Sequence, residues 1–166
     1  FQSLVHSILS QQISGAAAKT IKSRLNQAIE PAKLTPDSLL QFTTDDLRQI
    51  GISRQKAGYL FDLAEKVDSE QVKLSSLARK DDQTVIDELT QVKGIGVWTA
   101  QMFLMFSLAR LDVFPVDDLG IRNAIQKAYR IDHDLNRQEL LEMSQSWRPY
   151  ATVASWYLWR SLDLPD

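Results

Sequence analysis

The chain has 166 residues, a length typical of one domain or of two closely packed lobes. Hydrophobic residues make up 44% and charged residues 24%, which excludes disordered and fibrous proteins. The absence of cysteine excludes disulfides, thiolate catalysis, cysteine-ligated zinc and iron–sulfur clusters. A net charge of −2 favours a protein that acts on small molecules over one that binds nucleic acid, but it leaves room for a local basic face.

The hydrophobic segments and the two histidines indicate which kinds of protein and of site to expect. The apolar runs are far shorter than the ~18 residues of a membrane span, and the start does not read as a signal peptide. We therefore expect a cytoplasmic protein. His6 and His133 are too few and too far apart for a typical imidazole metal site, so we expect no metal held by side chains. Phe1 already lies in an apolar-periodic pattern, which indicates a fragment or a chain that has lost an upstream part.

Apolar residues recur with the 3.6-residue period along most of the chain, and this pattern predicts helices. Thr35 followed by Pro36 is typical of a helix start, and further starts are predicted at Thr44 and Ser53. Longer helices are predicted over residues 1–14, 16–28, 82–92, 97–109, 119–129, 137–147 and 149–162. Residues 68–81 are polar and are predicted to be a surface connection. The pattern predicts an all-α fold, a compact bundle of about ten helices.

One internal similarity stands out. Residues 47–53 resemble residues 89–96, with one additional residue in the second segment, and both read as helix, tight glycine turn, helix. We interpret the similarity of the first segment, residues 47–53, as chance, because many pairs of helices are joined by a short glycine turn.

The second copy places Gly94 and Gly96 on either side of Ile95. Glycine permits a positive φ and the close approach of another backbone. We expect Ile95 to insert into the core and fix the angle between the two helices. The amide groups at the start of the following helix would then form a phosphate site, to which Lys93 adds charge. A plain connection between two helices is the alternative.

Two adjacent acids, Asp117 and Asp118, precede the predicted helix 119–129 and follow an apolar extended segment around Pro115. At least one of them is expected to cap the helix. The other would point into a cleft, where an ionised carboxylate near a helix N-terminus stabilises an oxocarbenium-like transition state or orients a water molecule.

Taken together, the turn at 92–100, the segment 113–118 and the aromatic segment 147–159 resemble the helix-hairpin-helix (HhH-GPD) DNA glycosylase superfamily. The similarity is greatest to its 3-methyladenine DNA glycosylase II branch. It extends from residues 1–14, which are similar to that family's first helix, to about residue 162. The resemblance implies a two-lobed helical fold with a cleft and a helix-hairpin-helix motif. It implies one glycosylase domain over residues 1–166, without the family's N-terminal lobe.

By this resemblance Asp118 is the catalytic aspartate that supports departure of the base, and Asp117 is the residue that caps the helix. The hairpin that grips the DNA backbone would comprise Val92, Lys93, Gly94, Ile95, Gly96 and Val97. The resemblance also implies a monovalent cation at the carbonyl groups of Val92 and Ile95, and no other cofactor.

Trp98 occupies the position at which bifunctional relatives carry a catalytic lysine. Without an amine no Schiff base forms, so the resemblance implies an enzyme without lyase activity. Aromatic faces attract a cationic alkylated purine, by ~1–2 kcal/mol when desolvated. The implied base pocket comprises Trp98, Met102, Trp156, Tyr157 and Gln11. Tryptophans at helical spacing are more often core residues, and this is our interpretation of Trp147 and Trp159.

Gln12 aligns with the wedge that fills the gap left by an extruded nucleotide, and a polar residue at a helix end is the alternative. Position 151 is Ala151 where the family usually has arginine, a departure that affects the fine positioning of the site. Basic residues available for a DNA-binding face are Lys19, Arg54, Lys56, Lys93 and Arg122.

The sequence therefore predicts a monofunctional DNA glycosylase of base excision repair that hydrolyses the N-glycosidic bond of flipped-out 3-methyladenine or 7-methylguanine. We expect a monomer that binds damaged double-stranded DNA in a bacterial cytoplasm, on the nucleoid. The first alternative is a non-catalytic helix-hairpin-helix DNA-binding module, which would tolerate Asp118→Asn. The second is an unrelated helical binding domain, which would show no salt-dependent DNA binding.

Overall fold

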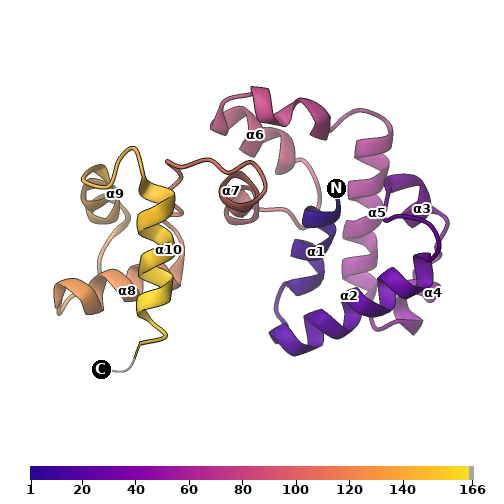
Figure 1. Cartoon of the computed structure of the whole chain (residues 1–166), viewed down its shortest axis with the longest axis horizontal. Coiled ribbons are helices and arrows are strands. Elements are labelled where there is room, and N and C mark those ends of the chain that lie inside the picture. Colours follow the sequence, from indigo (N-terminus) through magenta and orange to yellow (C-terminus); the bar gives the residue numbers. More distant parts are fainter. Residues whose placement is uncertain (165–166) are drawn as a thin grey trace. The chain divides into compact units, whose positions relative to one another are not determined.

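The computed structural model describes residues 1–164, and within these residues the regular elements are all helices, with no strand (Figure 1). The predicted all-α class is confirmed. The chain divides into two compact units, Phe1–Ala100 and Gln101–Asp166. Residues 165 and 166 of the predicted 1–166 domain lie outside the described part. The division agrees with two lobes, whereas a single domain and a cleft stay predictions.

The first unit is built around the long helix α5 (Arg54–Asp68), which packs against α1 (Gln2–Ser10), α3 (Pro36–Leu40) and α4 (Thr44–Gln49). Its other elements are α2 (Gly15–Ile29), the 3₁₀ helix η1 (Leu74–Arg79), α6 (Asp82–Leu89) and the start of α7 (Val97–Phe106). The inner face of α5 has helical spacing and is fully buried: Ala57, Leu60, Leu63 and Ala64. This helix therefore provides the frame on which the loops of the first unit are fixed.

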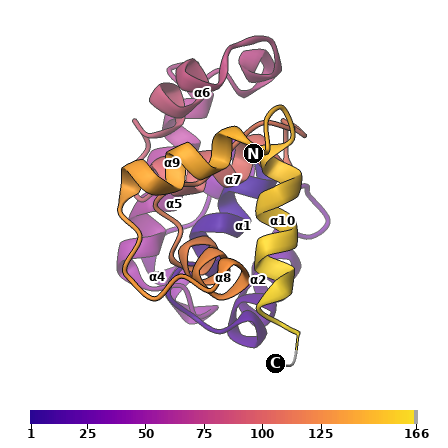
Figure 2. The same cartoon turned by 90° about the vertical axis from the view of Figure 1, so that its left-hand side faces the viewer.

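The second unit contains the end of α7, then α8 (Leu119–Tyr129), α9 (Arg137–Gln145) and α10 (Ala151–Ser161), which Figure 2 turns toward the viewer. Helices α8 and α10 pack against each other. Its core is apolar and comprises Val116, Ile121, Ile125, Leu135 and Leu140. The core begins two residues before Asp118, so burial of Val116 fixes the segment that carries the two adjacent acids.

Most helix boundaries agree with the sequence pattern. The side chain of Thr35 accepts a hydrogen bond from the N–H of Ser38, as expected of a cap, and α8 has the predicted bounds. The first helix, however, ends at Ser10 and not near Ser14, because Gln12 adopts a positive φ of 56° and Ser14 caps the next helix. The predicted connection 68–81 contains η1, whose Leu77 is buried.

Candidate functional site

The glycine turn between α6 and α7 has the predicted hairpin geometry. Gly94 has a φ of +83°, and the N–H of Ile95 donates to the carbonyl of Val92 at 3.0 Å. Ile95 is only 4% exposed, which confirms its predicted place in the core. Glycine is required at 94 for a second reason, because an added Cβ would lie 2.2 Å from the Tyr59 ring. The turn therefore packs closely against Tyr59 and is anchored in the core by Ile95.

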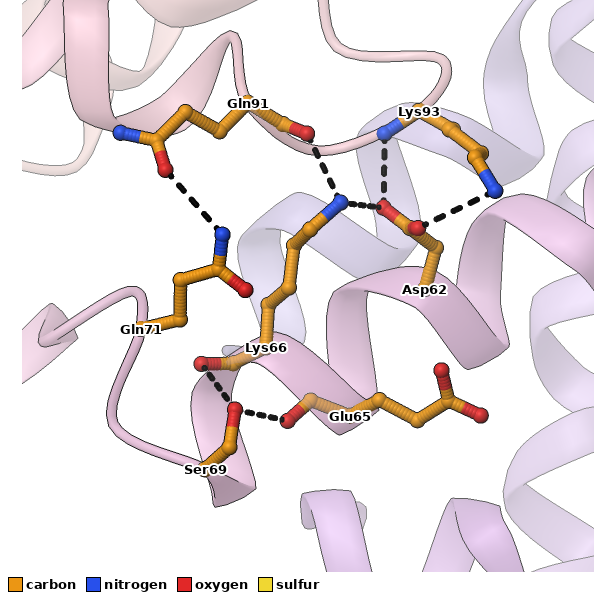
Figure 3. Close-up of polar contacts among 7 residues, drawn as sticks. All are labelled: Asp62, Glu65, Lys66, Ser69, Gln71, Gln91 and Lys93. Carbon is orange, nitrogen blue, oxygen red and sulfur yellow. Dashed lines mark hydrogen bonds and ion pairs between the residues drawn. The ribbon is translucent and has the colours of Figure 1, made fainter.

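The approach to this turn is anchored by Asp62 of α5 (Figure 3). Its carboxylate accepts hydrogen bonds from the Lys66 ammonium at 2.6 Å and from the N–H of Lys93 at 2.8 Å. The Lys93 ammonium lies 3.6 Å from the second carboxylate oxygen, and Lys66 also donates to the carbonyl of Gln91 at 2.8 Å. Burial raises the pKa of Asp62, but the hydrogen bonds and the two lysine charges outweigh it and lower that pKa overall.

The loop after α1 lies beside the hairpin. The side-chain amide of Gln11 donates to the carbonyl of Gly94 at 2.8 Å. Gln11 therefore supports the turn, and its predicted contact with the base stays a prediction. The loop and the hairpin line a groove of about 410 Å³ with Gln11, Gln12, Gln55, Lys56, Tyr59, Gly94, Ile95 and Gly96. The structure thus brings together the predicted wedge, Gln12, and the predicted DNA-gripping turn.

Lys56 differs from the DNA-facing cation expected from the sequence. Its ammonium donates to the carbonyl groups of Leu9 at 2.8 Å and Gln11 at 2.6 Å, so it is turned inward to the end of α1. Burial lowers the pKa of this ammonium group. Of the other predicted basic residues, Lys93 is 75% exposed beside the hairpin, although it also pairs with Asp62.

In the second unit, Asp118 is the residue that caps α8. Its Oδ1 accepts the N–H of Ile121 at 2.8 Å and the indole N–H of Trp159 at 3.0 Å. The expectation that Asp117 is the capping residue is wrong. Asp117 is largely exposed and pairs with Arg137 at 3.3 Å. Capping and the predicted catalytic role therefore fall on one carboxylate, which the cap holds in a fixed orientation.

Trp159 is a half-buried residue of α10. It packs against the core of the second unit, its ring centroid lies 6.2 Å from that of Phe106, and its indole N–H reaches Asp118. The predicted core role of Trp159 is confirmed, and its hydrogen bond to Asp118 adds a contact that the sequence did not predict. Trp147, by contrast, packs edge-on against Phe114 with centroids 5.6 Å apart, in agreement with a core role.

The predicted aromatic pocket residues are exposed. Trp156 and Tyr157 form an edge-to-face pair with centroids 5.2 Å apart, and they are 46% and 65% exposed. Met102 is partly buried, and it lies in the second unit with them. Trp98 is 45% exposed and belongs to the first unit. Exposed aromatic surface of this kind is typical of binding sites, and a common base pocket stays a prediction.

Ala151, the departure from the family pattern, is buried at the start of α10. The next residue, Thr152, makes polar contacts with the segment before Asp118. Its hydroxyl donates to the carbonyl of Arg110 at 2.7 Å and accepts the N–H of Val113 at 3.0 Å. These contacts tie α10 to the segment that leads to Asp118.

Two further features of residues 1–164 bear on the site. Residues 1–164 contain no cluster of three or more histidine, aspartate or glutamate side chains that could hold a metal ion. None of the helices in this range is long and apolar enough to cross a membrane. A larger cavity of about 560 Å³ lies in the first unit and contains none of the predicted site residues. It is lined by Ala28, Ile29, Ala32, Ser38, Gln41, Phe42, Asp46, Gln49 and Ile50.

The sequence interpretation missed Tyr59 and Asp62, and it misassigned Lys56 and the capping role of Asp117. Asp62 and Lys66 stand four residues apart on a helix, a spacing that predicts an ion pair but not its contact with the hairpin. No local signal marks Tyr59 as the residue that requires Gly94.

Comparison with known proteins gives a consistent result. The family model described as "HhH-GPD superfamily base excision DNA repair protein" matches residues 5–149. The Bacillus subtilis protein YfjP is 32% identical over 98% of this chain, which spans only 59% of that relative. A DNA-3-methyladenine glycosidase structure from Bacillus halodurans is 40% identical, with a TM-score of 0.88 over 96% of this chain and 74% of its own. The Schizosaccharomyces pombe 3-methyladenine DNA glycosylase in complex with abasic DNA is 33% identical, with a TM-score of 0.84 over 98% of this chain and 80% of its own.

Proposed function

This chain belongs to the HhH-GPD superfamily of base excision DNA repair proteins, and on that premise we propose that it is a monofunctional DNA glycosylase acting on alkylated purines. The observation that carries the proposal is the Asp118 carboxylate, held at the N-terminus of α8 by a backbone N–H and an indole N–H. Capping of α8 accounts for the backbone contact, and the indole N–H of Trp159 adds a second donor to the same carboxylate oxygen. The Schizosaccharomyces pombe relative, whose structure contains abasic DNA, supports the same reaction class.

In the proposed reaction the target nucleotide leaves the base stack and its N-glycosidic bond breaks. The bonding electrons depart with the purine, which is a good leaving group because N3- or N7-alkylation makes it cationic. Asp118 stabilises the positive charge that develops on the sugar, and water adds to C1′ and loses a proton. The product is an abasic site in an uncut strand, because Trp98 offers no amine for a Schiff base.

The remaining predicted residues complete this assignment. The hairpin 92–97 would hold the DNA backbone, Gln12 would fill the gap in the stack, and the aromatic set Trp98, Trp156 and Tyr157, with Met102, would receive the cationic base. Carbonyl oxygens suit hard cations, and the proposed ligands are those of Val92, which also accepts the N–H of Ile95, and of Ile95 itself. A monovalent cation held there would add positive charge toward a phosphate.

We also propose that the protein acts as a monomer on double-stranded DNA, on the nucleoid in a bacterial cytoplasm. Relatives from two Bacillus species support a bacterial source.

The test is release of methylated bases from alkylated duplex DNA by the wild type and by Asp118→Asn. We expect the variant to bind DNA normally but to release base roughly 10²- to 10³-fold more slowly, as when a group that stabilises transition-state charge is removed. Asp117→Asn is the matched control, because this neighbouring acid lies in the same segment but pairs with Arg137, and it should retain activity. If neither wild type nor Asp118→Asn releases base while both bind DNA with the same salt dependence, the protein is a non-catalytic binding module.

A further inference from the structure

The end of α1 is held by a side chain that the proposed reaction does not otherwise use. The Lys56 ammonium donates to the carbonyl of Leu9, in the last turn of α1, and to that of Gln11, the first residue of the following loop. Carbonyls of a last helical turn lack intrahelical partners, so this ammonium caps the helix from another element. Hydrogen bonds from a charged donor are stronger than neutral ones. Lys56 therefore fixes where the loop leaves the helix.

The next residue in that loop, Gln12, has a backbone conformation that needs support. Its φ of 56° is in the left-handed region, which costs a residue other than glycine roughly 1–2 kcal/mol. Its neighbour Gln11 is held twice, at its carbonyl by Lys56 and at its side-chain amide by the Gly94 carbonyl. On the other side, Ser14 caps α2 by accepting the N–H of Ala17. Strained backbone persists only where surrounding contacts fix it in this way.

From these contacts we infer that Lys56 is a positioning residue: it holds Gln12 in its left-handed conformation before DNA arrives, so that the wedge is already formed when the damaged base is extruded. The inference rests on the proposed function and on the role of Gln12 in it. A loop that is ordered in advance does not lose conformational entropy on binding, and affinity for DNA with a gap in its stack rises accordingly.

The test uses the ratio of two dissociation constants, that for an undamaged duplex over that for the same duplex with an abasic-site analogue. Lys56→Met keeps most of the side-chain volume but removes the donor. We expect it to lower this ratio roughly tenfold, the size of a typical coupling through a shared hydrogen-bond network or backbone shift. Binding of undamaged DNA and its salt dependence should not change, because phosphate contacts supply both. Lys56→Arg, which keeps the cation and its donors, should restore most of the ratio.

Two controls separate positioning from a general loss of structure. On a Gln12→Ala background, Lys56→Met should cause no further decrease, because the residue through which it acts is already gone. Lys66→Met is the matched control on the same helix: Lys66 also donates to a backbone carbonyl, but that of Gln91 in the hairpin. It should weaken binding of damaged and undamaged DNA equally. Urea unfolding of each variant measures whether the fold is retained.

The inference is overturned if Lys56→Met keeps the wild-type ratio, or if its effect is as large on the Gln12→Ala background. If Lys56→Met folds too poorly to assay, Lys56→Gln, whose shorter and uncharged side chain lacks the ammonium group, is measured under the same criteria. A wild-type ratio near one overturns the role of Gln12 as a wedge and this inference with it, whereas the proposed function fails only if the wild type releases no methylated base.

Discussion

The hairpin region of the first unit and the carboxylate region of the second are held by contacts of different kinds. The hairpin is fixed from α5, through Asp62, Lys66 and the ring of Tyr59, across about 30 residues of sequence. Asp118 is oriented mainly by its own helix, through the N–H of Ile121, with one indole from α10 added. The first kind of support comes from a separate helix, whereas the second is mostly local. Breaking each kind of support should therefore have different consequences.

The largest effect is expected when the hairpin loses its narrow turn. Gly94→Ala places a Cβ 2.2 Å from the Tyr59 ring at a φ of +83°. We expect the free energy of unfolding to fall by about 2–4 kcal/mol, with weaker DNA binding, because overpacking and backbone strain combine. Urea unfolding measures the first effect and a DNA titration the second. Gly96→Ala, where an added Cβ meets no atom within 4 Å, is the control. Equal effects of both variants would contradict this account of the turn.

The carboxylate region should respond in rate rather than in binding. Trp159→Phe removes the indole N–H that reaches Asp118 but keeps an aromatic ring in the core. The reaction needs the Asp118 carboxylate in one orientation, and misplacement of such a group slows reactions by up to about 10²-fold, so base release should slow roughly ten- to hundredfold while DNA affinity stays the same. Single-turnover kinetics measures this change. Trp147→Phe, at a tryptophan that packs on Phe114, should lower stability and not rate; a loss of rate in both would argue against a specific contact.

The anchoring of the hairpin should depend on pH. The folded-state pKa of Asp62 lies below the ordinary value of 3.8, so its stabilising contribution is complete above that value and is lost as the pH falls through the lower one. At pH 7 we expect Asp62→Asn to lower the free energy of unfolding by about 1–2 kcal/mol. The difference between variant and wild type should shrink toward acid pH in urea titrations. A difference that is constant from pH 7 to pH 3 would show that charge is not involved.

The smallest effect is expected at the exposed rim of the hairpin. Lys93 is 75% exposed, so replacing it with methionine should change stability little. If it contacts one phosphate, the slope of log affinity against log salt should fall by about 1. Lys33→Met, at an exposed lysine before α3, is the control and should leave the slope unchanged. An unchanged slope for Lys93→Met would remove this residue from the DNA interface.

The local features of the fold were predictable from sequence. Thr35 with Pro36 marks a helix start, and the paired glycines around Ile95 mark a turn whose central residue is buried. Capping and glycine conformations depend on neighbours a few residues away, so a sequence window contains the necessary information. The catalytic role proposed for Asp118 rests, by contrast, on the family resemblance and not on local geometry.

The tertiary contacts of the site were not predictable in the same way. Either Asp117 or Asp118 has the side chain needed to cap α8, and the indole of Trp159, 41 residues away, reaches only the second. Lysine is usually a surface residue, yet the Lys56 ammonium donates to two backbone carbonyl groups that lie 45 and 47 residues earlier in the chain. Such partners are determined by how helices pack, which single-residue chemistry does not specify.

The position of α5 has a practical consequence for chimeras. The loop at 11–14 and the hairpin at 92–97 both rest on side chains of this helix, which extend along it from Lys56 to Lys66. A chimera that takes either loop from a relative but keeps its own α5 would pair the new loop backbone with side chains of α5 that did not evolve with it. Exchange of these two loops between members of the family should therefore succeed when α5 is transferred with them.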